Sequence, residues 1–209
     1  MWNQVDMDSI TFGNPKTLDN GGKIIGLYHH GKNLVFQTPP MTAPYGISKW
    51  SNDNGMDKFS LDLSINNSEF LGMMKAFDAR IIKEGLGNSQ NWFKKTYGSA
   101  DILEALYTKI VKYSRNEEAA SKYPPVLNCK MPQKQGEFEC EVYDKDKNRV
   151  PVMSSVQNKS LVTAILQCTG IWVVGGKFGC TFKVIQMLVV PPNSITGYAF
   201  QDDADDEEM

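Results

Sequence analysis

Apolar and polar residues alternate along several stretches of the chain, and each such stretch predicts a half-buried β-strand. The clearest lies at 57–65, where every second residue from Phe59 to Ile65 is apolar and polar side chains occupy the positions between them. Shorter strands are expected at 23–28 and 33–37. A polar face and an apolar face on one strand indicate a sheet that covers a core on one side only.

From residue 126 onward the pattern is almost entirely that of strands. Two glycines and a lysine at 175–177 predict a tight hairpin between the two longest strands. Residues 1–22 are instead polar and rich in turn-forming residues, so no strand is expected there. The strands expected in the C-terminal half are 126–131, 137–143, 149–153, 160–174 and 178–190.

Two helices are expected between the early and the late strands. The first runs from Ser68 to about Glu84, with an apolar stripe at helical spacing, and Gly85 ends it. The second begins at Ser99 and runs to Arg115, with acids in its first turn and bases in its last, the order that the helix dipole favours. This element order predicts a mainly β protein (α+β) with a helical insert at about 68–115. We interpret it as an OB-fold-like antiparallel barrel, with a β-sandwich as the alternative.

Charge is unevenly distributed along the chain. The sequence contains 22 Lys+Arg and 24 Asp+Glu, and six of the acids lie in the last nine residues, so residues 1–200 carry a formal charge of 22 − 18 = +4. We therefore expect one domain at 1–200 and a disordered acidic tail at 201–209. The six acids of the tail are Asp202, Asp203, Asp205, Asp206, Glu207 and Glu208.

Catalytic and metal-binding motifs are missing from the sequence, so neither an enzyme nor a cofactor is expected. His29 and His30 are adjacent and would point to opposite faces of a strand, which does not suit a shared metal. The four cysteines form no C-x-x-C pair and are expected as buried, reduced thiols; two disulfides in a secreted domain are the alternative. Neither a secretory signal nor a membrane span is expected.

Basic residues interleaved with aromatic residues form four clusters. This mixture suits single-stranded nucleic acid, because cations neutralise phosphates while ring faces stack on unpaired bases. Each aromatic could instead belong to the core, and the sequence alone does not decide between the two roles. The clusters are Lys49 and Trp50; Trp92, Phe93, Lys94 and Lys95; Lys112, Tyr113 and Arg115; and Trp172, Lys177, Phe178 and Lys183.

Several segments resemble a known family in their order and texture: 59–65 leading into the first helix, then 137–143, 160–166 and 182–190, followed by the acidic tail. They are similar to the podophage-type replicative single-stranded DNA-binding proteins. The glycine, tryptophan and lysine pattern at 170–183 also resembles related proteins of large nucleocytoplasmic DNA viruses.

The resemblance implies an OB-fold that coats single-stranded DNA without sequence preference in replication, recombination and repair. It also implies that the acidic tail contacts a polymerase, a helicase or a primase. The charge pattern adds a tail that competes with DNA for the basic groove. Tails in this family commonly end in an aromatic residue, whereas this tail ends in Glu208 and Met209.

Two further function classes stay open from the sequence. The modest charge of residues 1–200 and the presence of only three arginines, Arg80, Arg115 and Arg149, fit a β-barrel protein-interaction or virion structural module. A metal-dependent nuclease using the carboxylates of 137–146 is the third, although a solvated hairpin explains those acids equally well. The DNA-binding interpretation places the protein inside a cell, in a viral replication compartment of the cytoplasm or nucleus if it is viral, and leaves a homodimer open.

Overall fold

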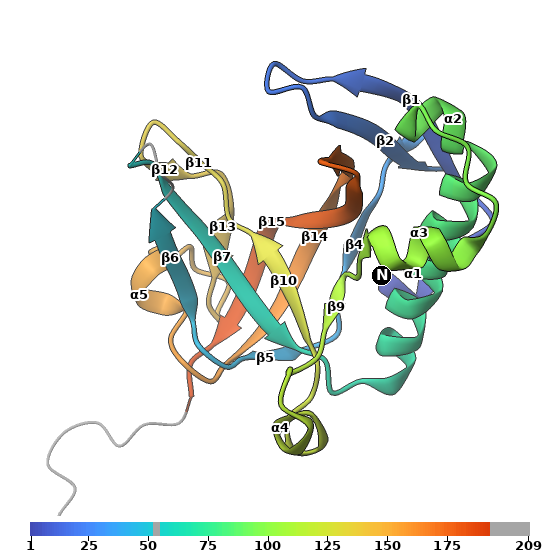
Figure 1. Cartoon of the computed structure of the whole chain (residues 1–209). Helices are drawn as coiled ribbons and strands as arrows, with labels where there is room; N and C mark the ends of the chain where they lie inside the picture. The colour runs from blue at the N-terminus through green and yellow to red at the C-terminus, as the bar shows by residue number, and fades with distance from the viewer. Residues whose placement is uncertain (52–54, 193–209) are drawn as a thin grey trace, which may run out of the picture.

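A ring of five hydrogen-bonded strands forms the centre of the structure (Figure 1). The structure is a computed structural model and describes residues 1–51 and 55–192. A closed ring with an odd number of strands cannot alternate in direction all the way round, so one neighbouring pair must be parallel. That pair is β10 and β15. In ring order the strands are β5 (Met41–Ala43), β7 (Asp57–Ser64), β10 (Val126–Lys130), β15 (Lys177–Val190) and β14 (Ser160–Val174), which returns to β5.

The closed ring confirms the mainly β, OB-fold-like barrel and not the β-sandwich, which would need two separate sheets. Most of the remaining strands extend the barrel wall, while β11 and β12 pair only with each other. The strands outside the ring are β1 (Ile10–Thr17), β2 (Lys23–His29), β3 (Lys32–Asn33), β4 (Val35–Gln37), β6 (Ile47–Ser51), β8 (Tyr107–Thr108), β9 (Val111–Lys112), β11 (Gln133–Lys134), β12 (Glu137–Phe138) and β13 (Glu141–Tyr143).

The alternation seen in the sequence becomes the division between core and surface. Leu61 and Leu63 of β7 are fully buried, as are Val162, Ala164 and Leu166 of β14. A fully buried leucine or valine contributes about 1.5–3 kcal/mol relative to an exposed one. All four cysteines are buried and unpaired in the structure, as predicted.

Helix α1 (Ser68–Gly87) covers one end of the barrel, and the Asn67 side chain caps it by accepting a hydrogen bond of 2.8 Å from the Phe70 amide. The predicted apolar stripe of this helix is buried. Gly85 lies inside the helix instead of ending it. The Trp92 ring packs 3.4 Å from the position that its Cβ would occupy, so the glycine allows this close contact. The shorter helices are η1 (Trp2–Gln4), α2 (Ser89–Phe93), α3 (Ala100–Leu106), α4 (Glu117–Lys122) and α5 (Val152–Ser155).

The second predicted helix is wrong beyond Leu106. The chain leaves α3 there and is fixed by Asp78 of α1, whose carboxylate accepts hydrogen bonds from the Tyr107 hydroxyl at 2.7 Å and from the Ile110 amide at 3.3 Å. The Ile110 amide is therefore not available to continue a helix. A long-range contact thus overrides a local pattern that favours helix.

Three further predictions differ from the structure. Residues 1–22 contain strand β1, whose Ile10 is buried and which pairs with β2. The strand expected at 137–143 is split into β12 and β13 around the buried Cys140. Residues 149–153 form one isolated bridge at Arg149 and then enter α5.

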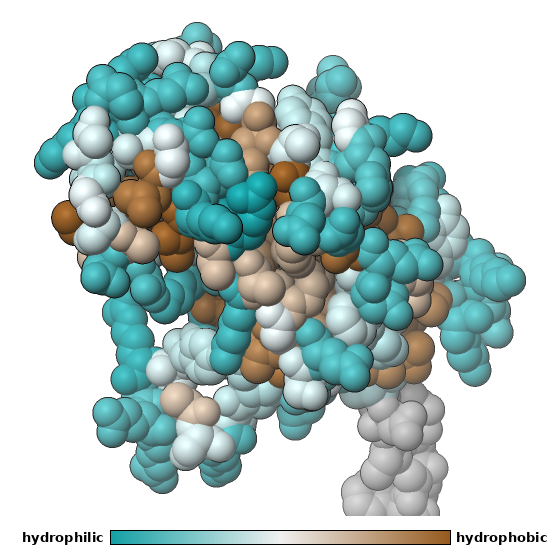
Figure 2. Space-filling model, turned by 90° about the vertical axis from the view of Figure 1, so that its right-hand side faces the viewer, coloured by the Kyte–Doolittle hydropathy of each residue, from teal (hydrophilic) through white to brown (hydrophobic). Residues whose placement is uncertain are grey.

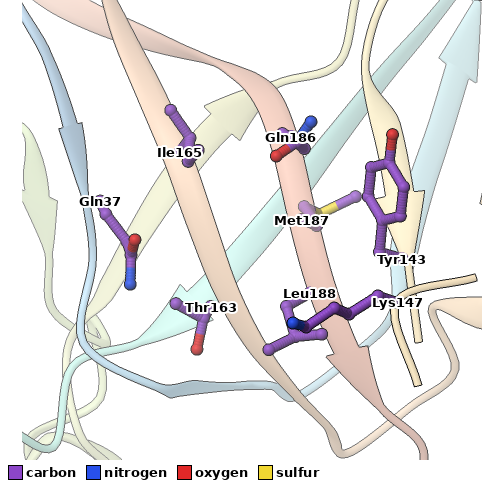
Figure 3. Close-up of a pocket in the computed structure, with 8 residues that line it drawn as sticks. All are labelled: Gln37, Tyr143, Lys147, Thr163, Ile165, Gln186, Met187 and Leu188. Carbon is purple, nitrogen blue, oxygen red and sulfur yellow. The ribbon is translucent and has the colours of Figure 1, made fainter. Parts of the chain in front are cut away.

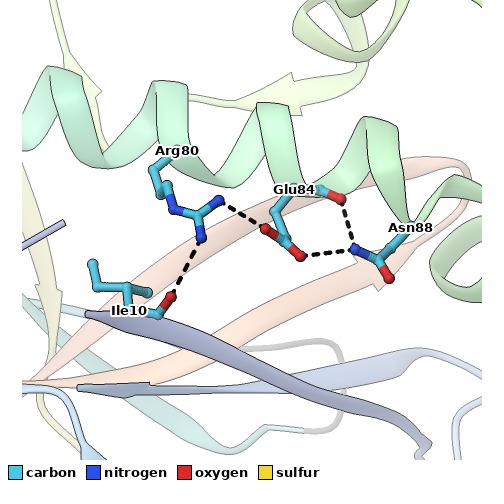
Figure 4. Close-up of polar contacts among 4 residues, drawn as sticks. All are labelled: Ile10, Arg80, Glu84 and Asn88. Atoms are coloured by element: carbon cyan, nitrogen blue, oxygen red, sulfur yellow. Dashed lines mark hydrogen bonds and ion pairs between the residues drawn. The ribbon is translucent and has the colours of Figure 1, made fainter. Parts of the chain in front are cut away.

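A polar network attaches the first strand to α1 (Figure 4). Arg80 donates to the Glu84 carboxylate at 2.7 Å and to the Ile10 carbonyl at 3.4 Å. The Asn88 amide donates to both the backbone carbonyl and the carboxylate of Glu84, at 3.1 and 2.8 Å. The Arg80 guanidinium also lies over the Phe12 ring, 5.3 Å from its centroid. Helix α1 is thereby tied to the sheet as well as packed on it.

Within residues 1–51 and 55–192, no helix has both the length and the apolar character that a membrane span requires. The acidic tail at 201–209 lies outside the described residues.

Candidate nucleic-acid interface

The outer face of β6, β7, β10 and β15 carries the polar residues that alternate with the buried core positions. Side chains on neighbouring strands that are in register lie next to one another on the same face. Asp62 of β7 illustrates this, because it faces Asn128 of β10 and accepts a hydrogen bond of 2.7 Å from the Asn128 amide. The two side chains show that this face points away from the core.

Three lysines cross this face and form what we call the lysine row: Lys58 of β7, Lys130 of β10 and Lys183 of β15. Lys130 is in register with Lys183 on one side and with Ser60 on the other, and Lys58 stands two residues before Ser60 on the same face. Adjacent strands lie about 4.8 Å apart, so Lys130 and Lys183 stand one strand spacing apart at their backbones. Lys58 lies diagonally from Lys130, about 7–8 Å away. A row of this kind can follow the phosphates of an extended nucleic-acid strand.

Trp50 of β6 lies at one end of the lysine row, in register with Lys58. Its side chain is 55% exposed, which is unusual for a residue that proteins tend to bury. The neighbouring Lys49 forms an ion pair of 2.9 Å with Asp57 and lies 5.9 Å from the centre of the Phe59 ring. Trp50 is therefore free to stack, whereas the Lys49 ammonium is held by the protein itself.

A groove of about 500 Å³ runs beside Trp50 and is lined by Lys58, Lys130 and Asp57, whose carboxylate is paired with Lys49. Phe59 lines it and makes an edge-to-face contact with Phe138, with ring centroids 5.0 Å apart. This contact fixes the β11–β12 hairpin beside β7, so the wall of the groove is built from packed side chains. The groove therefore combines an exposed indole with two ammonium groups.

The charges in this groove are only partly balanced. Among the described residues, neither Lys58 nor Lys130 has a carboxylate within ion-pair distance. Desolvation lowers the pKa of Lys130, and repulsion from Lys58 lowers it further. Lys183 differs, because Glu139 accepts from its ammonium at 3.3 Å. An anion placed between Lys58 and Lys130 would relieve their repulsion.

From Lys183, the outer face of β15 continues to the tip of the β14–β15 hairpin. Residues 177, 179, 181 and 183 share the outer face, since the residues between them are buried. Trp172 of β14 is in register with Gly179, and its ring lies 2.7 Å from the position of a Cβ at Gly179. The glycine thus allows the half-buried indole to lie flat on the strand, between the lysine row and the exposed Lys177.

The structure brings the cluster around Trp92 next to this hairpin. Phe93 contacts Phe178 with ring centroids 5.0 Å apart, and a small pocket of about 300 Å³ is lined by both the hairpin tip and the segment around Trp92. However, Trp92 is 1% exposed and Phe178 is fully buried. Their burial does not support the prediction that they stack on bases, because both rings are surrounded by the core.

Phe93 is also partly buried, between Phe178 and Tyr97. Lys94 and Lys95 are exposed beside it, and Lys94 has the left-handed backbone that ends α2, with φ 59°. Phe93 and Trp92 thus anchor the connector, while the two lysines remain available to solvent. Within this cluster, Lys94 and Lys95 are therefore the residues that can contact DNA.

The structure divides the third cluster. Lys112 belongs to β9 and is in register with Val126 of β10, on the outer face that also carries Lys130, since the neighbouring Val111 and Leu127 are buried. Tyr113 lies instead beneath Lys75 of α1, whose ammonium is 5.8 Å from the ring centroid. Lys112 therefore stays a candidate contact, whereas Tyr113 faces the helices.

The sequence predictions missed Lys58 and Lys130, which occupy the centre of the candidate interface. The signal was present, because both stand at polar positions of strands that were expected to be half-buried. Lys130 has no aromatic neighbour in the sequence, and Phe59, beside Lys58, lies on the apolar face of its strand, so neither lysine belongs to a predicted cluster. No group of three or more potential metal ligands occurs among the described residues.

Another outer face of the barrel has a different character (Figure 3). A hollow of about 460 Å³ lies over β14 and β15; Gln37, Thr163 and Ile165 line one side of it, and Gln186, Leu188, Tyr143 and Lys147 line the other. Lys147 is the one cation among its lining residues. This face therefore lacks the repeated positive charge that phosphates require.

The ring topology and the lysine row define a class: an OB-fold-like barrel with a basic outer face that carries an exposed indole. The chain belongs to a family of unknown function, DUF5871, whose model matches residues 52–202. No curated protein matches the sequence.

Solved structures of similar fold include two phage proteins. One is the single-stranded DNA-binding protein from bacteriophage Enc34 in complex with ssDNA, with 12% identity, a TM-score of 0.46, and coverage of 88% of this chain and 98% of that chain. Another is gp2.5, a single-stranded DNA-binding protein encoded by bacteriophage T7, with 11% identity, a TM-score of 0.49, and coverage of 79% and 91%. At these scores and identities, neither likeness is evidence for what this chain does.

Proposed function

We propose that this protein is a non-enzymatic, single-stranded DNA-binding protein that acts in DNA replication, recombination and repair. The observation that carries the proposal is the lysine row beside the exposed Trp50, on the outer face of β7 and β10. These are the second and third strands of an OB-type barrel, the surface on which this fold often binds oligonucleotides. The topology alone would be an analogy, since one fold can host many functions. The residues on the surface make the argument specific.

The proposed contacts are of two kinds. Lys58, Lys130 and Lys183 neutralise successive phosphates, and Trp50 stacks on an unpaired base. Trp172 and Lys177 extend the surface towards the hairpin that joins the fourth and fifth barrel strands. None of these contacts reads the hydrogen-bonding edge of a base, so binding is independent of sequence.

The acidic tail adds a regulatory element to the proposal. Six carboxylates at 202–209 belong to the same chain as the lysine row, so their effective concentration near it is high. In the absence of DNA the tail occupies the basic face, and DNA displaces it, which leaves the tail free for a polymerase, helicase or primase. Deletion of 202–209 should tighten DNA binding, most clearly at low salt, where screening is weakest.

The direct test is a titration of the purified chain with oligo-dT and with duplex DNA. Oligo-dT should bind more tightly and should quench tryptophan fluorescence, because stacking needs unpaired bases. Trp50→Ala should weaken binding by about 1–3 kcal/mol, as loss of one stacked base does. Tyr123→Ala, which removes a similarly exposed aromatic at the end of α4, away from β6, is the matched control and should leave the DNA affinity unchanged (Figure 1).

Equal affinity for the duplex would reject the single-strand proposal. Lack of any DNA binding would favour the protein-interaction module, and cleavage that depends on Mg²⁺ or Mn²⁺ would favour the nuclease.

A further inference from the structure

A second groove lies on the helical side of the molecule, away from the lysine row. It measures about 700 Å³ and is bounded by α1, α3 and the segment that contains β9. Figure 2 looks onto the side of the molecule where Figure 1 shows these helices, and hydrophobic side chains gather there between hydrophilic ones. This groove is not part of the DNA-binding proposal.

The floor of the groove is a second apolar stripe on α1. The first stripe, which includes Phe70 and Met74, faces the barrel core. Ala79, Ile82 and Leu86 are spaced three and four residues apart and line the groove instead. Helix α3 covers this second stripe only in part, so Ile82 and Leu86 remain partly accessible. A surface helix normally has one apolar face, and a second one indicates a contact surface.

The rim of the groove is basic. Its lining includes Lys75, Lys83 and Lys109 against two carboxylates, Asp78 and Glu104. Glu104 is paired with Lys109 at 2.7 Å. Asp78 is buried at the base of the groove, and its carboxylate already accepts hydrogen bonds from Tyr107 and Ile110. The two acids are therefore engaged within the protein.

Lys75 and Lys83 are the cations left for a ligand, because among the described residues neither has an ion-pair partner. They are eight residues apart on one helix, which corresponds to about 12 Å along its axis. An extended peptide covers that distance in about four residues. The groove thus suits a peptide that places an apolar anchor on the floor and acids on the rim.

The sequence of this protein contains such a peptide. Tyr198 and Phe200 precede the six acids of 202–209, with Gln201 between Phe200 and the first acid. The described chain ends at residue 192, after β15, and Figure 1 shows the end of β15 on the opposite side of the barrel from α1 and α3. Because β15 ends on the side away from α1 and α3, the groove of a second copy is an alternative to the groove of the same copy.

We propose that residues 198–209 of one copy bind the α1–α3 groove of a second copy. This contact joins two different surfaces, so it is heterologous and can link copies into an open chain. The inference rests on the proposed function in one respect: DNA that displaces the tail from the lysine row makes it available to the next molecule. Copies bound along one strand would then be coupled through their tails.

The test uses a fluorescein-labelled synthetic peptide of residues 193–209 and, without DNA, the chain truncated after residue 192 and carrying Lys58→Glu/Lys130→Glu, so that the lysine row cannot take the peptide. Fluorescence anisotropy should show saturable binding at low salt. The double variant Lys75→Glu/Lys83→Glu should weaken it at least tenfold. The matched control, Lys16→Glu/Lys32→Glu, makes the same change of charge at two exposed lysines of β1 and β3 and should weaken it less than threefold. Circular dichroism confirms that both variants fold.

A second peptide, with Tyr198 and Phe200 both replaced by serine, tests the apolar floor and should bind at least fivefold more weakly. Equal binding of the two peptides would overturn the proposal, since it would indicate charge attraction alone. Binding to the truncated chain with its lysines intact, together with no binding to the Lys58→Glu/Lys130→Glu background, would also overturn it, by placing the tail on the lysine row only. No binding of the peptide to either chain would do the same.

The coupling on DNA is measured separately with the full chain. Lys75→Glu/Lys83→Glu should bind a short oligo-dT, long enough for one molecule, as the unchanged protein does. On a long oligo-dT it should lose cooperativity, seen as a broader binding isotherm. Failure of the chain to bind any oligo-dT would reject the proposed function but would leave the peptide result intact, so the two proposals fail in different experiments.

Discussion

Removal of the lysine row should change the salt dependence of DNA binding by an amount that the structure sets. For single strands, the logarithm of the binding constant falls with the logarithm of salt concentration with a slope of about −0.7 for each phosphate neutralised. The row contains Lys58, Lys130 and Lys183, so replacing all three by alanine should make the slope shallower by about 2. The contribution of Lys183 should be the smallest of the three, because Glu139 already lies 3.3 Å from its ammonium.

The assay is fluorescence anisotropy of labelled oligo-dT over a series of NaCl concentrations, with the slope taken from the binding constants. A triple variant of Lys16, Lys32 and Lys145 to alanine is the matched control. It removes the same charge from exposed positions outside the face that carries the row. A general effect of net charge would change both triple variants alike, whereas phosphate contacts would change only the first.

An unchanged slope in the first variant would refute the reasoning, even if its affinity fell. Affinity can fall because of a small structural disturbance, but the slope counts the counterions that binding releases. Equal changes in both variants would also refute it, because the row would then have no special position.

Three further outcomes are expected. Glu139→Gln should tighten oligo-dT binding, measured by the same anisotropy assay, because it frees the Lys183 ammonium; weaker binding would contradict this role. Trp92→Ala should lower the free energy of unfolding in urea by about 3–5 kcal/mol, as the loss of a buried aromatic does, with little change in the DNA affinity of the folded fraction. Burial raises the pKa of Asp78, so the proton bound to its carboxyl group stabilises the fold most at acidic pH. This contribution is complete below about pH 4, the ordinary pKa of an aspartic acid, and is lost as pH rises through the pKa of the folded state. The free energy of unfolding of the unchanged protein relative to Asp78→Asn should therefore fall as pH rises across that interval, in urea titrations at a series of pH values.

The strands and the first helix could be predicted because their patterns are local and strong. The alternation at 57–65 became β7, the stripe after Ser68 became α1, and the glycines at 175–177 became the turn of the longest hairpin. The alternation also predicted which residues form the core, since the apolar positions of these strands are buried.

The rest depended on contacts between distant residues. No residue near Ile110 in the sequence indicates that its amide will donate a hydrogen bond to Asp78, 32 residues earlier, and so prevent the helix from continuing. Trp50 and Trp92 both stand beside basic or polar residues, yet one is exposed on an outer strand and the other is enclosed by Phe12 and Phe93. A sequence shows which residues can stack, but only the fold decides which ring faces solvent.

The parallel pairing of β10 with β15 has a consequence for the order in which the protein is made. Lys130 and Lys183 are 53 residues apart in the chain, yet they meet in register on one surface. The barrel cannot close until β15 has been synthesised and has paired with β10. Pairing between strands so far apart in the sequence is also slow to form. A chain emerging from the ribosome therefore lacks the complete candidate interface until β15 has been translated. An unfinished copy would expose the unpaired edge of β10 instead, so premature termination before β15 should give a product that aggregates.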